Sequence, residues 1–415
     1  MFFSSEAASA SFLLPLTARD FLSYACVVAA LFFIYINTSF GIIGSACEDI
    51  EGWLSEQKSV INFSFAGVSK SSDTLPLRAA ANENLAIAFN ITNSLTTISP
   101  STHKFFLKTA SSIINRSDRD WTVLFETARS TLIAELIRDT SQPLHLAEVT
   151  RITCLIVVLV DNFHVPSPAS LPRESLVIIT DQINDQWLKA KLSTKPVPSP
   201  LLSHHLSILQ LALRSSDRVL KPEEILGTIM PQYETLWRVV LVTYLLAFHL
   251  YSSPTLQDRI SSVPECLGTN FDEEKEALKL AKEGLRLTPS NKRIYRHTPA
   301  PNSQKVKADL ELMHRHPSIW GWSALKFNPS RFDNLTKLQT EAYLPYSIRP
   351  HRCPASGGFG DRMVTCLVVA MGRVLDTATG KVDNVGYPCN AERKGVIGTA
   401  RDELEGWRYT PTVYK

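Results

Sequence analysis

The chain has 415 residues, with 43 Lys and Arg against 40 Asp and Glu, so its formal net charge at neutral pH is +3. These charges are small in sum and scattered, which does not indicate a nucleic-acid-binding protein. The seven cysteines are odd in number, widely spaced and include no Cys-x-x-Cys pair. This spacing argues against a disulfide framework and a zinc site, and favours a body that folds in a reducing compartment.

The first predicted element is a membrane anchor. No Lys, Arg, Asp or Glu occurs from Phe21 to Cys47, and the first part of this run is almost wholly apolar. A run of about 20 such residues can cross the hydrocarbon core as a helix. We therefore expect a short N-terminal segment (1–20), a transmembrane anchor (21–44) and one large domain (45–415). A cleaved signal peptide is the alternative, although Arg19 is the only basic residue before the run.

The large domain is predicted to be mainly helical with a small β component. Residues 48–82 are polar and mixed, and we interpret them as a connector. Apolar residues at helical spacing then predict helices within 83–136, 150–163, 175–192, 223–250 and 272–287. Pro231 should kink or break the helix at 223–250, whose second half is apolar nearly all round and should be buried. Short strand-like runs in 373–415 predict a small sheet that closes a pocket.

One loop holds a cysteine among basic residues and prolines. It runs from Tyr346 through Arg349 and His351 to Cys353 and Ala355. Because a nearby positive charge stabilises a thiolate, the pattern favours the charged form of Cys353, which a metal ligand or nucleophile requires. The following glycines lead into an apolar helix, whose N-terminal N–H groups would also favour a negative sulfur.

The cysteine loop resembles the haem-binding loop of the cytochrome P-450 family, Phe-x-x-Gly-x-Arg/His-x-Cys-x-Gly/Ala. Tyr346 takes the aromatic place, His351 the basic place, Cys353 the place of the iron ligand and Ala355 the small place, while Arg349 replaces the glycine. The resemblance implies a mainly helical haem fold behind the anchor, with b-type haem (heme b) ligated by Cys353. It also implies that His351, together with Arg349, contacts the haem propionates.

Three further motifs occur in the order of that family. Glu283 and Arg286 resemble its Glu-x-x-Arg helix, and Arg331, in Phe-Asn-Pro-Ser-Arg-Phe, resembles the third member of its structural triad. Glu234 and Thr235 resemble its acid–alcohol pair, which can relay protons to bound dioxygen. Taken alone, Glu234 would be a solvated charge, Thr235 a core residue, and the polar face of 272–287 a solvent-exposed one. The Trp-x-x-x-Arg helix of the family, whose Arg contacts a propionate, is not found.

The resemblance implies a haem-thiolate monooxygenase that oxidises a small lipophilic substrate, in the style of fungal secondary metabolism. Electrons would come from NADPH through a separate cytochrome reductase, since the chain carries no Gly-rich nucleotide fingerprint. The expected location is the endoplasmic reticulum membrane, with the catalytic domain in the cytosol. Two alternatives remain: an inactive relative of the family, and a cofactor-free, membrane-anchored helical interaction protein.

Overall fold

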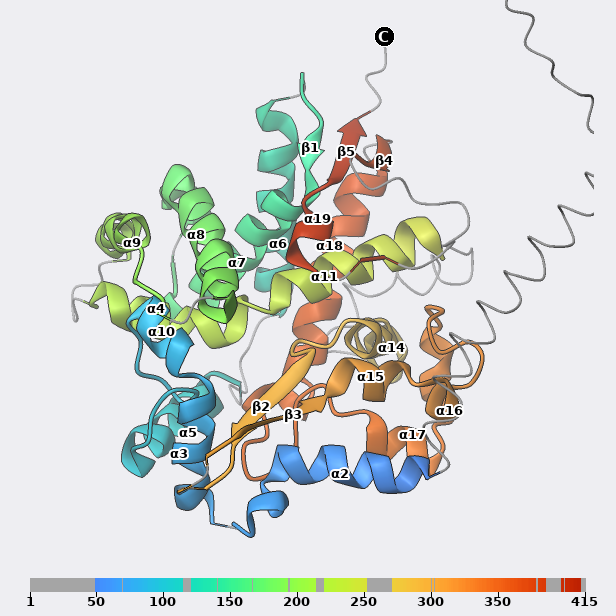
Figure 1. The fold of residues 1–415 in the computed structure, drawn as a ribbon. Coiled ribbons are helices and arrows are strands. Elements are labelled where there is room, and N and C mark those ends of the chain that lie inside the picture. Colours follow the sequence, from blue (N-terminus) through green and yellow to red (C-terminus); the bar gives the residue numbers. More distant parts are fainter. Residues whose placement is uncertain are drawn as a thin grey trace, which may run out of the picture. The chain divides into compact units, whose positions relative to one another are not determined.

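Figure 1 shows the fold in a computed structural model, which describes residues 49–68, 70–114, 121–139, 141–165, 167–192, 195–213, 220–251, 271–299, 301, 303–377, 380–385, 397–398 and 400–411. The chain divides into two compact units, residues 1–53 and 54–415. The predicted anchor at 21–44 lies outside the described residues. Within the described part of the chain, no helix is both long enough and apolar enough to cross a membrane.

The fold is mainly helical with few strands, as predicted. The helices are α2 (Ile50–Asn62), α3 (Ser71–Ala81), α4 (Glu83–Phe89), α5 (Pro100–Ile114), α6 (Trp121–Arg138), α7 (Leu146–Phe163), α8 (Arg173–Leu192), α9 (Pro200–Ala212), α10 (Pro222–Tyr233), α11 (Leu236–Tyr244), α14 (Phe271–Leu287), α15 (Leu310–Arg315), α16 (Pro317–Trp320), α17 (Lys337–Ala342), α18 (Phe359–Thr377) and α19 (Arg401–Leu404). The strands are β1 (Leu144–His145), β2 (Arg293–His297), β3 (Lys305–Asp309), β4 (Gly380–Asn384) and β5 (Trp407–Pro411).

Helix α11 lies at the centre of the hydrophobic core. It packs against α7, α14 and α18, and α6 packs against both α7 and α18 (Figure 1). Every residue of α11 is buried, which confirms the prediction from its all-round apolar sequence. Because α11 is buried on all sides, it holds the residues at its ends in fixed positions. The chain is broken directly before its N-terminal end.

The long helix predicted at 223–250 is interrupted just beyond its proline. Pro231 lies inside α10, which ends at Tyr233, and α11 begins at Leu236. Proline lacks the N–H that would bond to the carbonyl four residues earlier, and this weakens the last turn of α10. Glu234 and Thr235 therefore lie in the break. After α11 the chain continues as a short π-helix, Leu245–Leu250.

Two small antiparallel sheets complete the fold. Strands β2 and β3 form a hairpin, with Arg293 opposite Asp309, and a second sheet has the order β1-β5-β4. The second sheet confirms the strands predicted in the tail. No described residue of it lines the large cavity, however, so the expectation that this sheet closes the pocket is wrong. The tail reaches the cavity through Ala400, Arg401 and Asp402 instead.

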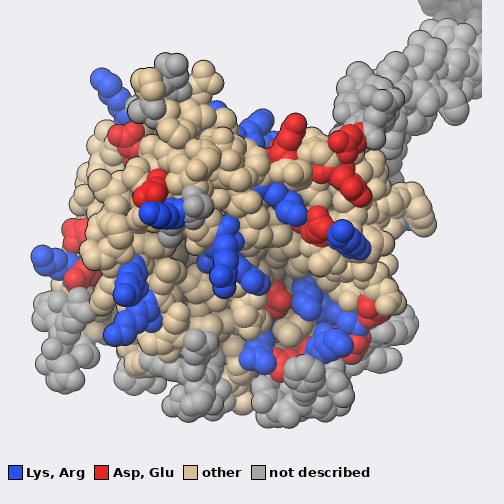
Figure 2. Space-filling model, turned by 90° about the horizontal axis from the view of Figure 1, so that it is seen from below, with Lys and Arg blue, Asp and Glu red and all other residues tan. Residues whose placement is uncertain are grey.

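The interpretation of 48–82 as a connector is also wrong. These residues form α2 and α3, and α3 packs against β2. Pro76 lies inside α3, and the apolar periodicity that marks a helix is weak in α3. On the face of the molecule in Figure 2, basic and acidic side chains are interspersed, in keeping with the small net charge.

Candidate functional site

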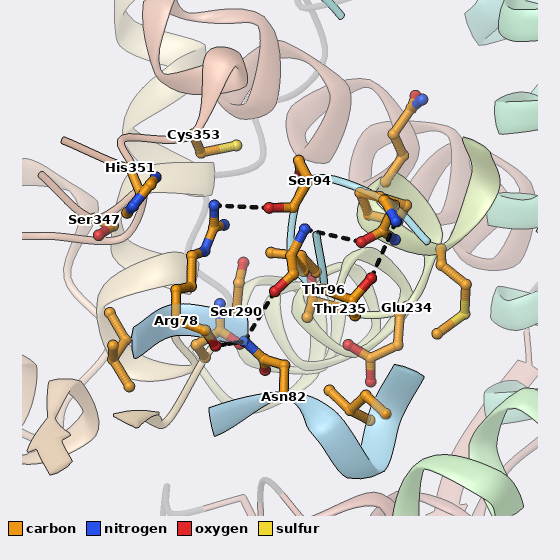
Figure 3. A pocket seen from close by; sticks show the side chains of 18 of the residues that line it. Arg78, Asn82, Ser94, Thr96, Glu234, Thr235, Ser290, Ser347, His351 and Cys353 are labelled. Carbon is orange, nitrogen blue, oxygen red and sulfur yellow. Dashed lines mark hydrogen bonds between the residues drawn. The ribbon is translucent and has the colours of Figure 1, made fainter. Parts of the chain in front are cut away.

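A cavity of about 1250 Å³ lies beside the break in the central helix. Its wall combines α3, α5, α10, α11, β2, the cysteine loop, the start of α18 and the tail. Figure 3 shows Cys353 and His351 on one side of this space and Glu234 and Thr235 on the other. The cysteine loop and the helix break, which are far apart in the sequence, thus face the same interior volume.

Cys353 sits where the loop turns into η5 (Pro354–Gly357) and then α18. Its N–H donates to the carbonyl of Tyr346 at 2.9 Å, which ties the two ends of the loop together. Cys353 is exposed, whereas Cys154 and Cys366 are buried. Among these three described free cysteines, Cys353 alone presents its sulfur to an open space, and that space is the cavity.

The charge environment of Cys353 differs from the one predicted. Desolvation raises the pKa of its thiol, and the opposing influences are the N–H of Ala355 and the guanidinium of Arg78. No basic residue of its own loop is among these influences, and burial and neighbouring cations lower the pKa of His351 to about 3. The prediction that the basic residues of the loop favour the thiolate of Cys353 is therefore wrong for the protein without a bound cofactor.

The other predicted loop residues divide into two groups. Tyr346, His351 and Ala355 line the cavity, while Arg349 is exposed and is absent from its wall. The Tyr346 hydroxyl donates to the Asp361 carboxylate at 2.7 Å and thereby joins the loop to α18. The Tyr346 ring occupies the space that a side chain at Gly360 would need, so this glycine allows the close approach of loop and helix.

His351 bonds across the fold to a helix that the sequence did not predict. Its Nε2 lies 2.8 Å from the hydroxyl of Thr74 on α3, and its buried Nδ1 has no hydrogen-bond partner in the described part of the chain. The ring packs edge-on against His103, at a centroid distance of 5.3 Å. His351 is thus held firmly at the cavity wall, but as a neutral imidazole.

Two arginines near Cys353 were missed by sequence reasoning. Arg78 on α3 donates to the carbonyl of Ser94 at 3.0 Å and has a pKa lowered to about 10 by burial. Arg296 on β2 is buried, donates to the carbonyl of Tyr295 at 2.8 Å, and has a buried Nε that no described residue accepts a bond from. No ion pair joins either arginine to a carboxylate of the described residues. Arg296 follows the Glu-x-x-Arg motif within ten residues of Arg286, so its basic character was a usable signal.

Glu234 and Thr235 lie together in the helix break, as the resemblance implied. Thr235 is half-buried at the start of α11, and its side chain makes no capping bond there. Glu234 is 3% exposed and is not a solvated charge, because it forms an ion pair with Arg401. Both residues line the cavity. No sequence pattern indicated that Arg401, far along the tail, pairs with this carboxylate.

Glu283, Arg286 and Arg331 also come together, but away from the cavity wall. The Glu283 carboxylate accepts two bonds from Arg286, at 2.7 and 2.8 Å, and lies 3.5 Å from the Nε of Arg331. Glu283 and Arg286 are fully buried, so a solvent-exposed polar face of α14 is excluded for these residues. A carboxylate and a guanidinium that are both fully buried require the bidentate pairing that Glu283 and Arg286 show.

The triad is connected to the cysteine loop through a histidine. Arg286 donates to the carbonyl of His314 at 2.7 Å, and the Nε2 of His314 accepts the N–H of Leu344 at 2.9 Å. The Tyr343 hydroxyl also donates to the carbonyl of Lys282 on α14 at 3.1 Å. The buried charges therefore hold the segment that leads into the loop of Cys353.

Curated proteins that match part of the chain are cytochromes P-450. The putative cytochrome P-450 CYP13A2 of Caenorhabditis elegans is 32% identical over 130 residues, which is 27% of this chain and 24% of the relative. The putative CYP13A1 of the same species is 27% identical over 159 residues, which is 33% of this chain and 31% of the relative. Cytochrome P-450 709B3 of Arabidopsis thaliana is 39% identical over 62 residues, which is 14% of this chain and 12% of the relative.

No family model matches the chain. The matched segments span less than a third of each relative's length. This partial similarity supports the relation to cytochromes P-450 that the motifs indicated. The three relatives come from a nematode and a plant, so a fungal type stays a prediction.

Proposed function

We propose that the protein is a haem-thiolate monooxygenase of the cytochrome P-450 type that oxidises a small lipophilic substrate. The observation that carries the proposal is the position of Cys353, an exposed thiol on the wall of a large cavity, opposite Glu234 and Thr235 (Figure 3). The partial similarity to cytochromes P-450 supports the same reaction class.

The cavity residues fit a haem. Cys353 offers the sulfur ligand, and the volume of about 1250 Å³ leaves room for a porphyrin with a substrate. A haem carries two carboxylates, and the cysteine side of the cavity has Arg78 and Arg296 without carboxylate partners among the described residues. The buried Nδ1 of His351 and Nε of Arg296, which have no hydrogen-bond partners among the described residues, are donors that a carboxylate would satisfy. Arg78, Arg296 and His351 would hold the haem propionates.

Bound haem would supply the activation of dioxygen, with electron donation from the cysteine sulfur favouring O–O cleavage. The chain's own residues then have separate tasks. The Thr235 hydroxyl, half-buried at the helix break, would pass protons toward the cavity, and Glu234 beside it would relay them. Apolar side chains of α5 and α10, among them Phe106 and Met230, line the cavity and would hold a lipophilic substrate away from water.

Partners and location belong to the same proposal. Electrons would reach the haem from NADPH through a separate cytochrome reductase. The uncharged run at 21–44 would anchor the protein in the endoplasmic reticulum membrane, with the catalytic domain in the cytosol. A role in fungal secondary metabolism is proposed on the style of the sequence motifs alone.

The decisive measurement is the absorbance spectrum of the reduced, carbon monoxide-bound protein, expressed with ample haem precursor. The proposal requires the red-shifted Soret band of thiolate ligation. Cys353→Ala should abolish this band, whereas the matched control Cys154→Ala, at a buried cysteine that does not line the cavity, should retain it. Protein without haem, or a band that survives Cys353→Ala, would overturn the proposal.

A second measurement separates an active enzyme from an inactive relative. NADPH consumption with an added reductase, in the presence of a binding substrate, is expected for the active enzyme. A normal thiolate band without any NADPH consumption would instead identify a haem protein that lacks monooxygenase activity.

A further inference from the structure

The loop of Cys353 needs contacts from outside to keep its shape. The N–H of Cys353 donates to the carbonyl of Tyr346 at 2.9 Å, and this bond closes the loop between its two ends. Next to Tyr346, Ser347 has a φ of 61°, in the left-handed region that favours glycine, and its buried hydroxyl has no hydrogen-bond partner among the described residues. A residue other than glycine keeps such a conformation where the surrounding structure imposes it.

Tyr346 supplies a contact of this kind to α18. Its hydroxyl donates to the carboxylate of Asp361 at 2.7 Å. Its ring fills the space beside Gly360, since a Cβ built at that glycine would collide with the ring and the hydroxyl oxygen. Tyr346 is therefore bound at its tip by α18 and at its carbonyl by the N–H of Cys353.

Asp361 is a fixed point of attachment for the loop. It is 9% exposed and lies in the first turn of α18, where the N–H groups of the helix N-terminus favour a carboxylate. Desolvation raises the pKa of Asp361, and the Tyr346 hydroxyl and the charge of Lys282 oppose that rise. The start of α18 is itself held, because the ring of Phe359 packs on Trp121 of α6 at a centroid distance of 5.6 Å.

The hydroxyl of Tyr346 is a departure from the pattern that the loop resembles. The aromatic place of that pattern is Phe, which cannot make the bond to Asp361. Tyr346 is half-buried, and a hydroxyl that is taken out of water costs free energy unless it finds a partner. Asp361 supplies such a partner, so the two residues form a matched pair in this chain.

We propose that Asp361 is a positioning residue for Cys353, which it holds at the cavity wall through Tyr346. Two hydrogen bonds make up the connection, from the Tyr346 hydroxyl to Asp361 and from the Cys353 N–H to the Tyr346 carbonyl. The inference rests on the proposed function for what the sulfur binds, and on these two bonds for where the sulfur is held.

The test uses the full chain, purified after expression with ample haem precursor. If haem is bound, the reduced carbon monoxide complex is followed over time, as the red-shifted band of thiolate ligation converts to a band at shorter wavelength. If no haem is bound, pulse alkylation with iodoacetamide and mass spectrometry measure the reaction rate of Cys353. Neither readout requires turnover, and alkylation of the buried Cys154 reports global unfolding.

Tyr346→Phe keeps the ring and removes the hydroxyl. Loss of one hydrogen bond should make the band conversion, or the alkylation of Cys353, about threefold faster. Tyr409→Phe is the matched control, because the Tyr409 hydroxyl donates to the carbonyl of Leu375 at 2.8 Å, near the other end of α18, and Tyr409 does not line the cavity. No acceleration in Tyr346→Phe, or an equal one in Tyr409→Phe, would overturn the inference.

Two variants of Asp361 separate the hydrogen bond from the charge. Asp361→Asn keeps an oxygen that can accept from Tyr346, so it should behave like the unchanged protein. The double variant Tyr346→Phe, Asp361→Leu leaves no carboxylate without its donor but still lacks the bond, so the acceleration should persist. Recovery in the double variant, or acceleration in Asp361→Asn, would attribute the effect to the charge and reject the positioning role.

The two readouts also distinguish this inference from the proposed function. A protein without haem in which Tyr346→Phe accelerates the alkylation of Cys353 would reject the monooxygenase and keep the positioning role. A haem-loaded protein whose thiolate band is as persistent in Tyr346→Phe as in the unchanged chain would keep the proposed function and reject the positioning role.

Discussion

Glu234 and Arg401 form a buried ion pair between the break in the central helix and helix α19 of the tail. Arg401 also donates to the Asn184 side chain at 2.7 Å and lies over the rings of Trp187 and Trp237. A carboxylate held in this way has its charge balanced inside the protein. Any proton transfer through Glu234 therefore starts from a carboxylate that a guanidinium already holds in place.

Removal of Arg401 should destabilise the fold. In Arg401→Leu the Glu234 carboxylate stays buried without its counter-charge, which typically costs about 3–5 kcal/mol of unfolding free energy. Urea denaturation followed by circular dichroism measures this change. The double variant Arg401→Leu, Glu234→Leu removes both charges and should recover most of the loss. If the double variant is as unstable as the single one, the loss comes from Arg401 packing against the two tryptophans and not from the orphaned charge.

The triad predicts a ranked series of stability losses. Arg286→Ala should cost about 3–5 kcal/mol, because it leaves the buried Glu283 carboxylate and two buried carbonyls without their main donor. Arg331→Ala should cost less, since its Nε lies 3.5 Å from the same carboxylate. The control is Arg129→Ala, whose exposed pair with Glu126 is worth only about 0.3–0.5 kcal/mol. Denaturant midpoints give the order, and equal values for Arg286→Ala and Arg129→Ala would disprove it.

The elements with strong apolar periodicity could be predicted from the sequence. The helix expected at 150–163 is observed as α7, Leu146–Phe163, and the helix at 272–287 as α14, Phe271–Leu287. Cys353 and Thr235 could be assigned to one site only through the family resemblance, because no periodicity relates a loop to a distant helix break. The fold then shows that both line one cavity.

The residues that were missed share a physical cause. Arg78 lies on α3, a helix that contains a proline and has weak apolar periodicity, so the sequence pattern does not predict a helix there. Arg401 pairs with a carboxylate in a distant part of the chain, and such a pairing leaves no local pattern. The neutral state of His351 depends on burial against α3 and on the charge of Arg78, and neither can be seen in the loop sequence.

Stability should fall in mild acid because of His314. Burial and the nearby Arg286 lower its pKa from 6.5 to about 3 in the folded protein. Between these values the unfolded chain holds a proton that the folded chain does not. The unfolding free energy should therefore decrease as the pH falls below about 6.5, by up to about 1.4 kcal/mol per pH unit for this group, and it should show no such dependence above that pH.

Urea denaturation at pH 7.5, 6.5 and 5.5 measures the slope. His314→Gln is the informative variant, because an amide oxygen can accept the Leu344 N–H but does not titrate. Its slope below pH 6.5 should be smaller by the equivalent of one proton. The remaining slope should come in part from His351 and His249, whose pKa values burial lowers to about 3 and about 4. An unchanged slope in the variant would show that His314 is not the group responsible.

Gly284 lies between the two members of the Glu-x-x-Arg motif and sets the spacing of two core helices. A Cβ built at this position would meet the hydroxyl and Cβ of Thr243 on α11, so α14 and α11 approach closely only because residue 284 has no side chain. Gly284→Ala should therefore destabilise the protein, by about 1–3 kcal/mol, although alanine favours helix in isolation. Gly227→Ala is the control, since a Cβ there meets nothing within 4 Å and the helix preference of alanine should stabilise it slightly. The pair Gly284→Ala, Thr243→Ala removes most of the clashing side chain and should recover stability, which thermal unfolding would measure. A Gly284→Ala protein as stable as Gly227→Ala would mean that the helices can separate at no cost, and that the triad's position does not depend on their close packing.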